Sequence, residues 1–242
     1  MFNIIKIDST NSTNSELKKL CSEQNLQSFS VLVAQKQISG RGQVGNSWES
    51  EPYKNLIFSI ILYPENLPVK QSFIISEIFS LAVKETLDHY TEHIFIKWPN
   101  DIYFQDKKIC GILIENEITG DLISSSIIGI GLNVNQEQFI SNAPNPISLK
   151  QITGKNHDPN KLLDSILNNA KEKYQHFLLE NINAFYTGYL NSLYRKSGYY
   201  TYQDKNGYFQ AQIKAIKEDG TLLLETPSGA IRNYLFKEVR FV

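Results

Sequence analysis

Cysteine, net charge and long apolar runs are all scarce in this sequence. The 242 residues include two cysteines, Cys21 and Cys110, which are too few for a disulfide framework and typical of a reducing compartment. Lysine and arginine number 24 and acidic residues 25, so no broad attraction to nucleic acid or an anionic membrane is expected. No run of about 18 apolar residues and no signal-peptide pattern occurs. These absences predict a soluble cytoplasmic protein that binds neither DNA nor membrane.

The composition is that of a folded protein. Hydrophobic residues make up 41% and charged residues 20%, which excludes disorder and collagen-like repeats, and the length allows one or two domains. Apolar and β-branched runs predict strands at residues 2–8, 30–36, 55–63, 94–97, 102–104, 108–117 and 122–134. After Arg195, short strand patterns separated by glycine turns replace the helical ones. A small β-barrel is therefore expected there, with a domain boundary near residue 194.

Helical patterns alternate with these strands. Thr13 and Glu16 have the spacing of a capping box at the start of a short helix. A long amphipathic helix is expected after Pro68, and another over residues 160–180, where an Asp-Pro pair favours a helix start. A shorter helical stretch runs to about residue 193.

A glycine-bearing loop, Gly40-Arg41-Gly42-Gln43-Val44-Gly45, matches the pattern G-x-G-x-x-G. A dinucleotide fingerprint would open a helix, whereas here a tryptophan, a proline and a strand follow. The V-A-I-K lysine motif and the D-F-G motif of protein kinases are absent as well. Two interpretations stay open: a tight loop that needs glycine for its backbone angles, or a loop whose N–H groups and guanidinium approach an anion.

Polar and small residues interrupt the strands that follow. The segment Lys-Trp-Pro-Asn-Asp ends a short strand at residues 97–101. Lys108 then enters an otherwise apolar strand, either as a solvated edge residue or as an ammonium group aimed into a pocket. Gly111 in that strand indicates close approach of a ligand or of another backbone. Gly129 and Gly131 leave one face of the next strand open.

The segment His89-Tyr90-Thr91-Glu92-His93 matches an inverted zinc-protease pattern, which needs both histidines on one helical face. Here the pattern spans the expected end of a helix and the start of a strand. No dedicated metal site is predicted.

Together and in this order, the segments resemble the biotin protein ligase family. The matching motifs are S-T-N at 12–14, Q-x-x-GRG-x-x-G-x-x-W at 37–48, KWPND at 97–101, KK-x-x-GILIE at 107–115 and N-V-N at 133–135. The resemblance implies an α+β fold: a class II synthetase-like catalytic domain over residues 1–194, with a mixed or antiparallel sheet and helices on one face, then an SH3-like β-barrel over 195–242. Because the first strand begins at residue 2, the resemblance is to the short, monofunctional form without a DNA-binding domain.

The resemblance also implies a reaction. Biotin and ATP would react to biotinyl-5′-AMP and pyrophosphate, and a lysine of a biotin carboxyl carrier protein would then displace AMP. Mg²⁺ would accompany ATP, and no covalent enzyme intermediate would form. The protein would orient two anions and stabilise the charge that develops on them.

Individual roles follow from the resemblance. Lys108 and Arg41 would hold the biotin carboxylate and α-phosphate, and Asp101 would orient or deprotonate the incoming lysine. The expected biotin-binding residues are Ser12, Thr13, Asn14, Gln37, Gly40, Arg41, Gly42, Lys108, Gly111 and Gly131. The expected adenylate- or ATP-binding residues are Arg41, Gln43, Trp48, Lys97, Asn100, Lys108 and Asn133. Trp48 and Trp98 would wall the pocket.

One departure from the family pattern concerns the loop cations. Two arginines common in the family are replaced by Gln43 and Asn46, which weakens the attraction to phosphate. We therefore hypothesise one of two consequences. Either a lysine, Lys97 or Lys107, compensates for the missing arginines, or the protein retains the biotinyl-5′-AMP intermediate less tightly.

Two other functions remain to be weighed. A lipoate ligase or octanoyltransferase shares the fold, and the transferases pass through an acyl-cysteine. Cys110 lies two residues from Lys108 and would share its strand face, although a buried structural cysteine is the more common case. A non-catalytic biotin or adenylate sensor is the third possibility, and the presence of both Arg41 and Lys108 favours catalysis over it.

Overall fold

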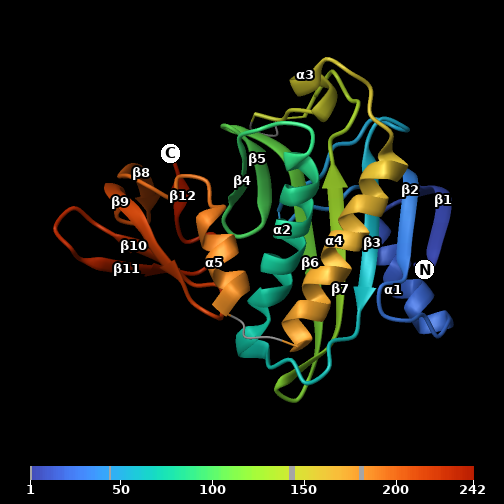
Figure 1. The fold of residues 1–242 in the computed structure, drawn as a ribbon, viewed down its shortest axis with the longest axis horizontal. Coiled ribbons are helices and arrows are strands. Elements are labelled where there is room, and N and C mark those ends of the chain that lie inside the picture. Colours follow the sequence, from blue (N-terminus) through green and yellow to red (C-terminus); the bar gives the residue numbers. More distant parts are fainter. Residues whose placement is uncertain (1, 44, 142–144, 180–182) are drawn as a thin grey trace.

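The computed structural model describes residues 2–43, 45–141, 145–179 and 183–242. A seven-stranded sheet with helices packed against it forms the larger part, and a smaller sheet extends from one end (Figure 1). The C-terminus lies in the smaller sheet, and the N-terminus lies at the far side of the larger one. No helix within the described ranges is long and apolar enough to cross a bilayer.

The large sheet is mixed, as predicted. Its strands are β1 (Ile4–Thr10), β2 (Val31–Gln37), β3 (Leu56–Leu62), β4 (Ile94–Lys97), β5 (Asp101–Phe104), β6 (Lys107–Thr119) and β7 (Leu122–Leu132). Their order is β1-β2-β3-β7-β6-β5-β4. The pair β1 and β2 is parallel and the other neighbours are antiparallel. Every strand expected before residue 135 is therefore present, within about two residues of its expected ends.

Four of the helices follow the sequence patterns, whereas the short helix at residues 149–153 was not predicted. The helices are α1 (Thr13–Glu23), a 3₁₀ turn (Val69–Gln71), α2 (Phe73–Asp88), α3 (Leu149–Thr153), α4 (Pro159–Leu179) and α5 (Asn183–Asn191). Glu180, the expected end of α4, lies outside the described residues. The capping box expected from Thr13 to Glu16 does not form, because Ser12 takes the N-cap position without a side-chain cap bond. The Thr13 hydroxyl instead donates to Gln37 Oε1 at 3.2 Å.

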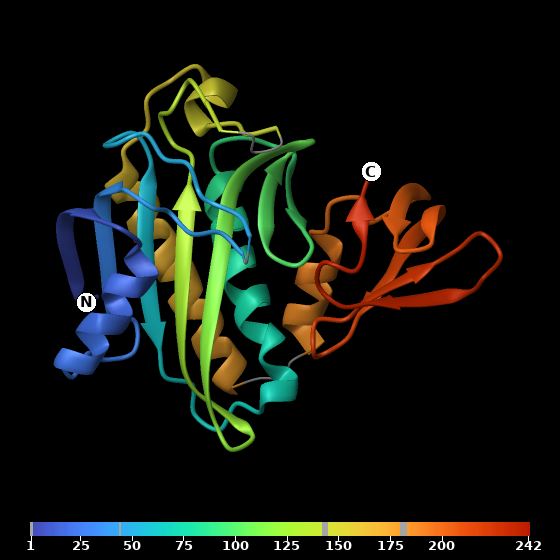
Figure 2. The same ribbon diagram turned by 180° about the vertical axis from the view of Figure 1, so that it is seen from behind.

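Helices cover both faces of the large sheet, which corrects the expectation of helices on one face. α2 and α4 lie on one face and α1 on the other, as the two opposite views show (Figures 1 and 2). Every residue of β3 is buried, since its alternate side chains meet the two helical layers. On the α1 side, Leu17, Leu32 and Ile61 belong to a small core separate from the main one.

The region after Arg195 is all β, as predicted. Its strands are β8 (Tyr200–Asp204), β9 (Gly207–Ile216), β10 (Leu222–Glu225), β11 (Ile231–Tyr234) and β12 (Arg240–Phe241). They form one antiparallel sheet in the order β11-β10-β9-β8-β12. Trp98, which follows β4, contacts this region. Its Nε1 donates a hydrogen bond to the Gly220 carbonyl at 2.9 Å, and the centroids of the Trp98 and Phe236 rings are 6.0 Å apart.

Glu77 is a carboxyl group buried between α2 and the smaller sheet. It is 5% exposed and borders a cavity of about 580 Å³ that Lys70, Tyr186 and Lys217 also line. Burial raises the pKa of Glu77 to about 7, because the charged form loses its hydration. The folded chain therefore retains a proton that the unfolded chain releases near pH 4.5.

Replacement of Glu77 by Gln should change how stability depends on pH. As pH rises from about 4.5 to 7, the native protein should lose roughly 2–4 kcal/mol relative to Glu77→Gln, since the unfolded chain releases its proton first. Thermal unfolding of both proteins at pH 5 and pH 8 measures this difference. The exposed Glu218→Gln is the control, and a Glu77→Gln difference that is equal at both pH values would contradict the prediction.

Candidate active site

A cavity on the α1 face of the large sheet collects most of the predicted site residues. Its walls are the start of α1, the end of β2, the glycine loop, and the neighbouring strands β6 and β7. Among the predicted residues, those that line it are Ser12, Thr13, Asn14, Gln37, Arg41, Gly42, Gln43, Trp48, Asp101, Lys108, Gly111 and Gly131. This cavity is called the slot below. Segments from residue 12 to residue 131 thus meet at one place on the sheet.

Glycines form the floor of the slot. A Cβ on Gly131 would lie 2.5 Å from Cε2 and Nε1 of Trp48, and one on Gly111 would lie 2.9 Å from Cζ3 of the same ring. The Trp48 indole therefore lies directly on the bare sheet, where any side chain would displace it. Its Nε1 is buried and has no hydrogen-bond partner among the described residues.

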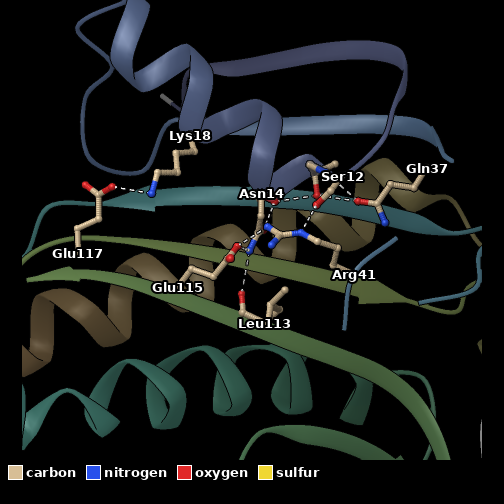
Figure 3. Close-up of polar contacts among 10 residues, drawn as sticks. Ser12, Asn14, Lys18, Gln37, Arg41, Leu113, Glu115 and Glu117 are labelled. Atoms are coloured by element: carbon tan, nitrogen blue, oxygen red, sulfur yellow. Dashed lines mark hydrogen bonds and ion pairs between the residues drawn. The ribbon is translucent and has the colours of Figure 1, made fainter. Parts of the chain in front are cut away.

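Two cations line the slot, and each is paired with a carboxylate. Lys108 Nζ lies 2.8 Å from Asp101 Oδ2, and it lies 5.7 Å from the centroid of the Trp48 ring. Arg41 Nη2 lies 2.8 Å from Glu115 Oε2 (Figure 3). Both pairs are partly exposed, so an anionic ligand could reach both cations from solvent.

Hydrogen bonds order the α1 end of the slot. Gln37 Oε1 accepts from the backbone N–H of Thr13 at 2.8 Å as well as from its hydroxyl. Ser59 Oγ lies 2.8 Å from Thr13 Oγ1 and 2.6 Å from Asn14 Oδ1. These polar groups are held by neighbours on β2 and β3, which suits them to a ligand with both N–H and carbonyl groups.

Several predicted residues lie outside the slot. Lys97 Nζ contacts the Tyr103 hydroxyl at 3.1 Å and lies 5.4 Å from the Phe241 ring centroid, and burial lowers the pKa of Lys97. Lys107 is exposed at the start of β6. Neither of these lysines is among the residues that line the slot. The hypothesis that Lys97 or Lys107 replaces the missing loop cations therefore stays a prediction, although Lys97 lies close enough to Asp101 and Lys108 to interact with both charges.

The remaining predicted residues lie around the slot without lining it. Asn100 Oδ1 accepts a long hydrogen bond of 3.5 Å from Gln43 Nε2. Asn133 Nδ2 donates to the Ile147 carbonyl at 3.1 Å, and its buried Oδ1 has no partner among the described residues. Gly40 accepts a backbone hydrogen bond from Trp48 at the base of the loop. Trp98 packs against the smaller sheet and does not line the slot itself, but it lines a neighbouring cavity together with Gln43 and Asn100.

A β-bulge corrects the expected position of Cys110. The register between β5 and β6 shifts so that Tyr103 pairs with Lys108 and Ile102 pairs with Cys110. Because the bulge adds a residue, Lys108 lines the slot together with Gly111, while Cys110 lies in the main core on the other side. The Cys110 side chain is fully buried, and this burial raises the pKa of its thiol well above the usual range.

Three residues that sequence reasoning did not assign to the site contribute to it. Glu115 binds Arg41 and Asn14, Ser59 lies against Asn14, and a Cβ on Gly129 would lie 2.2 Å from Asn14 Oδ1. The sequence could have identified Glu115 and Gly129, because residues an even number of positions apart on a strand share a face. Glu115 lies four residues after Gly111 on β6, and Gly129 lies two residues before Gly131 on β7. Ser59 has only a weak signal, as a polar residue within an apolar strand.

Comparison with known proteins decides the family. A family model described as the biotin/lipoate A/B protein ligase family matches residues 6–133, which is more than half of the chain. The chain belongs to this family. The resemblance inferred from the motifs is thereby confirmed, and the matched segment contains the residues that line the slot.

Individual members of the family are similar over most of the chain. The bifunctional ligase/repressor BirA of Bacillus subtilis is 30% identical over 237 residues, covering 94% of this chain and 70% of BirA. A biotin–[acetyl-CoA-carboxylase] ligase of Paracoccus denitrificans is 30% identical over 162 residues, covering 64% of this chain and 66% of that protein. The structure of a biotin protein ligase from Aquifex aeolicus with biotin and ATP superposes with a TM-score of 0.80 at 29% identity, covering 99% of both chains.

The glycine floor predicts the effect of one added methyl group. In Gly131→Ala, the new Cβ would overlap the Trp48 ring, so Trp48 should move toward solvent and its fluorescence should shift to longer wavelength. The measurement uses a Trp98→Phe background, in which Trp48 is the sole tryptophan. Gly188→Ala is the matched control, since its Cβ would lie 3.8 Å from Leu81 Cδ1, an ordinary contact. An unchanged spectrum in Gly131→Ala would contradict the packing of Trp48 on the floor.

Proposed function

We infer that this chain is an ATP-dependent biotin–protein ligase, which activates biotin as biotinyl-5′-AMP and transfers it to a lysine of a biotin carboxyl carrier protein. The observation that carries this inference is that Arg41 and Lys108 line one slot, beside sheet positions without side chains. The names of two relatives agree with it, because the Paracoccus denitrificans protein is named a biotin–[acetyl-CoA-carboxylase] ligase and the structure of the Aquifex aeolicus biotin protein ligase contains biotin and ATP.

Activation requires two anions to approach each other. The biotin carboxylate oxygen attacks the α-phosphorus of ATP, the bond to the bridging oxygen breaks, and pyrophosphate leaves. The Arg41 guanidinium and the Lys108 ammonium reduce the repulsion between carboxylate and phosphate and stabilise the charge that develops on the oxygens. The Trp48 ring, which lies on the glycine floor, supplies a flat apolar surface for the ring and the alkyl chain of biotin.

Transfer requires a neutral amine. The nitrogen of the acceptor lysine attacks the acyl carbon of biotinyl-5′-AMP, the acyl–phosphate bond breaks, and AMP leaves. Asp101 is the only carboxylate among the described residues that line the slot, and it is placed to accept the proton that this amine loses. Its contact with Lys108 Nζ keeps the proton acceptor and the positive charge next to each other.

Mg²⁺ would enter with ATP. In the described part of the chain, no group of three or more His, Cys, Asp or Glu side chains is arranged to hold a metal ion. Triphosphate oxygens are good ligands for Mg²⁺, and the ion would reduce the negative charge that Arg41 and Lys108 face.

The alternatives have less support. An acyl-cysteine mechanism needs a thiolate in the slot, but Cys110 is fully buried on the opposite side of the sheet, and Cys21 does not line the slot. A pure biotin or adenylate sensor needs neither Lys108 paired with Asp101 nor a second cation for phosphate. Both features support catalysis.

We further propose that residues 1–194 form the catalytic domain and that residues 195–242 form an SH3-like barrel. The change from a mixed sheet to a separate antiparallel sheet after Arg195 supports this division. A cytoplasmic location is proposed as well, and the two free cysteines agree with a reducing compartment.

Loss of the Lys108 ammonium should abolish activity. Lys108→Ala should lower biotin transfer at least about 100-fold, because a preorganised cation at the reacting oxygens is lost. Cys110→Ala should stay within about threefold of the native rate, since the thiol is remote from the chemistry. The assay is mass spectrometry of a biotin carrier domain after incubation with biotin, ATP and Mg²⁺, with lipoate in a parallel reaction. Activity that survives Lys108→Ala, or disappears in Cys110→Ala, would contradict the mechanism.

Replacement of Gln43 by Arg should restore a loop cation to the slot. We expect Gln43→Arg to slow the release of biotinyl-5′-AMP about three- to tenfold, since a charge-assisted contact to phosphate is added. Release is measured by trapping the free adenylate after a single turnover. Gln27→Arg, which adds the same charge at an exposed site far from the slot, is the control. Equal release rates in the native protein and Gln43→Arg would end the idea of looser retention.

A further inference from the structure

Glu115 lies beside the slot and binds two slot residues from different segments. Its Oε2 accepts from Arg41 Nη2 at 2.8 Å and from Asn14 Nδ2 at 2.7 Å (Figure 3). Arg41 belongs to the glycine loop and Asn14 to the first turn of α1, while Glu115 projects from β6. One carboxylate oxygen therefore joins three segments that are far apart in the sequence.

The hydrogen bond from Asn14 to Glu115 determines how the side-chain amide of Asn14 is oriented. Asn14 Nδ2 faces Glu115 and the Leu113 carbonyl, which is 3.3 Å away, so Oδ1 faces Ser59. Because an amide oxygen only accepts, Ser59 donates to it. The space at Gly129 is filled by the same Oδ1, so the amide is fixed on all sides.

Glu115 also fixes one edge of the Arg41 guanidinium. Of the five N–H donors of Arg41, one on Nη2 meets Glu115, and Nε is 3.5 Å from Ser12 Oγ. The other three have no protein partner among the described residues and remain for an anionic ligand. Within residues 38–48, Arg41 is the only cation, so the attraction of this loop for phosphate depends on how Arg41 is held.

We propose that Glu115 is a positioning residue that acts through Arg41: it fixes Arg41, and with it the neighbouring loop residues 40–43, at the slot and so retains the reactive acyl-adenylate. This proposal rests on the proposed function. The Arg41 side chain is 45% exposed and the Glu115 side chain 40% exposed. The ion pair can therefore open when a ligand enters, and dissolved salt weakens it. Its loss should loosen the loop without removing a group that touches the reacting atoms.

The experiment compares Glu115→Gln with Glu117→Gln. Glu117 lies two residues further along β6 and makes an ion pair of the same kind, 2.9 Å to Lys18, outside the slot (Figure 3). Glu115→Gln should release biotinyl-5′-AMP about three- to tenfold faster and raise the KM for biotin by a similar factor, with kcat within about twofold. Glu117→Gln should have the same release rate, KM for biotin and kcat as the native protein.

A double-mutant cycle tests whether Glu115 acts through Arg41. In an Arg41→Met background loaded with synthetic biotinyl-5′-AMP, Glu115→Gln should have a clearly smaller effect on adenylate release, because only its contact with Asn14 remains. Hydrogen exchange on the ligand-free proteins gives a readout that does not depend on activity. Glu115→Gln should speed exchange of the backbone amides of residues 45–48 severalfold, and Glu117→Gln should not.

The possible outcomes separate the two proposals. Slower release or a lower KM in Glu115→Gln would mean that Glu115 competes with the ligand for Arg41, and the proposal would be overturned. Equal effects of the two Gln variants, or additive effects of Arg41→Met and Glu115→Gln, would overturn it too. A native protein that forms no adenylate from biotin and ATP would refute the proposed function, and the exchange measurement would then still decide whether Glu115 holds the loop.

Discussion

The site depends on a part of the sheet that carries no side chains. At Gly111 and Gly131 the backbone of two adjacent strands is bare, and Trp48 lies flat on it. At Gly129 the same strand makes room for the Asn14 amide. Any Cβ at these places would move a residue that lines the slot, so the glycines fix the depth of the slot and the position of its walls.

Charge is arranged around this floor in cation–carboxylate pairs. Lys108 with Asp101 and Arg41 with Glu115 are each held at 2.8 Å, and all four side chains are partly exposed. Ion pairs of this kind keep the cations oriented while no ligand is bound. Separating them costs little free energy, because solvent still reaches both groups. The protein thus presents two oriented positive groups to anionic substrates without burying an uncompensated charge.

The sequence predicted most of the fold and much of the slot. Alternating and continuous apolar runs located the strands, and the motifs around Arg41 and Lys108 named residues that do meet in one cavity. Predictions failed where a residue's direction depends on its neighbours. Cys110 was expected beside Lys108, and the bulge turns it into the core instead. The direction of Lys97 likewise depends on its neighbours, because its ammonium group lies against the Tyr103 hydroxyl and the Phe241 ring.

By itself, the sequence determined the elements of this protein and the chemical groups available to it: glycines in two strands, one arginine in a glycine-bearing loop, and a lysine at the start of a strand. Only the tertiary structure decided which of these groups share a cavity and which carboxylate holds each cation. The reason is physical. Local patterns set backbone periodicity, whereas the pairing of Glu115 with Arg41 and Asn14 arises from strand register and from the packing of α1 across the sheet.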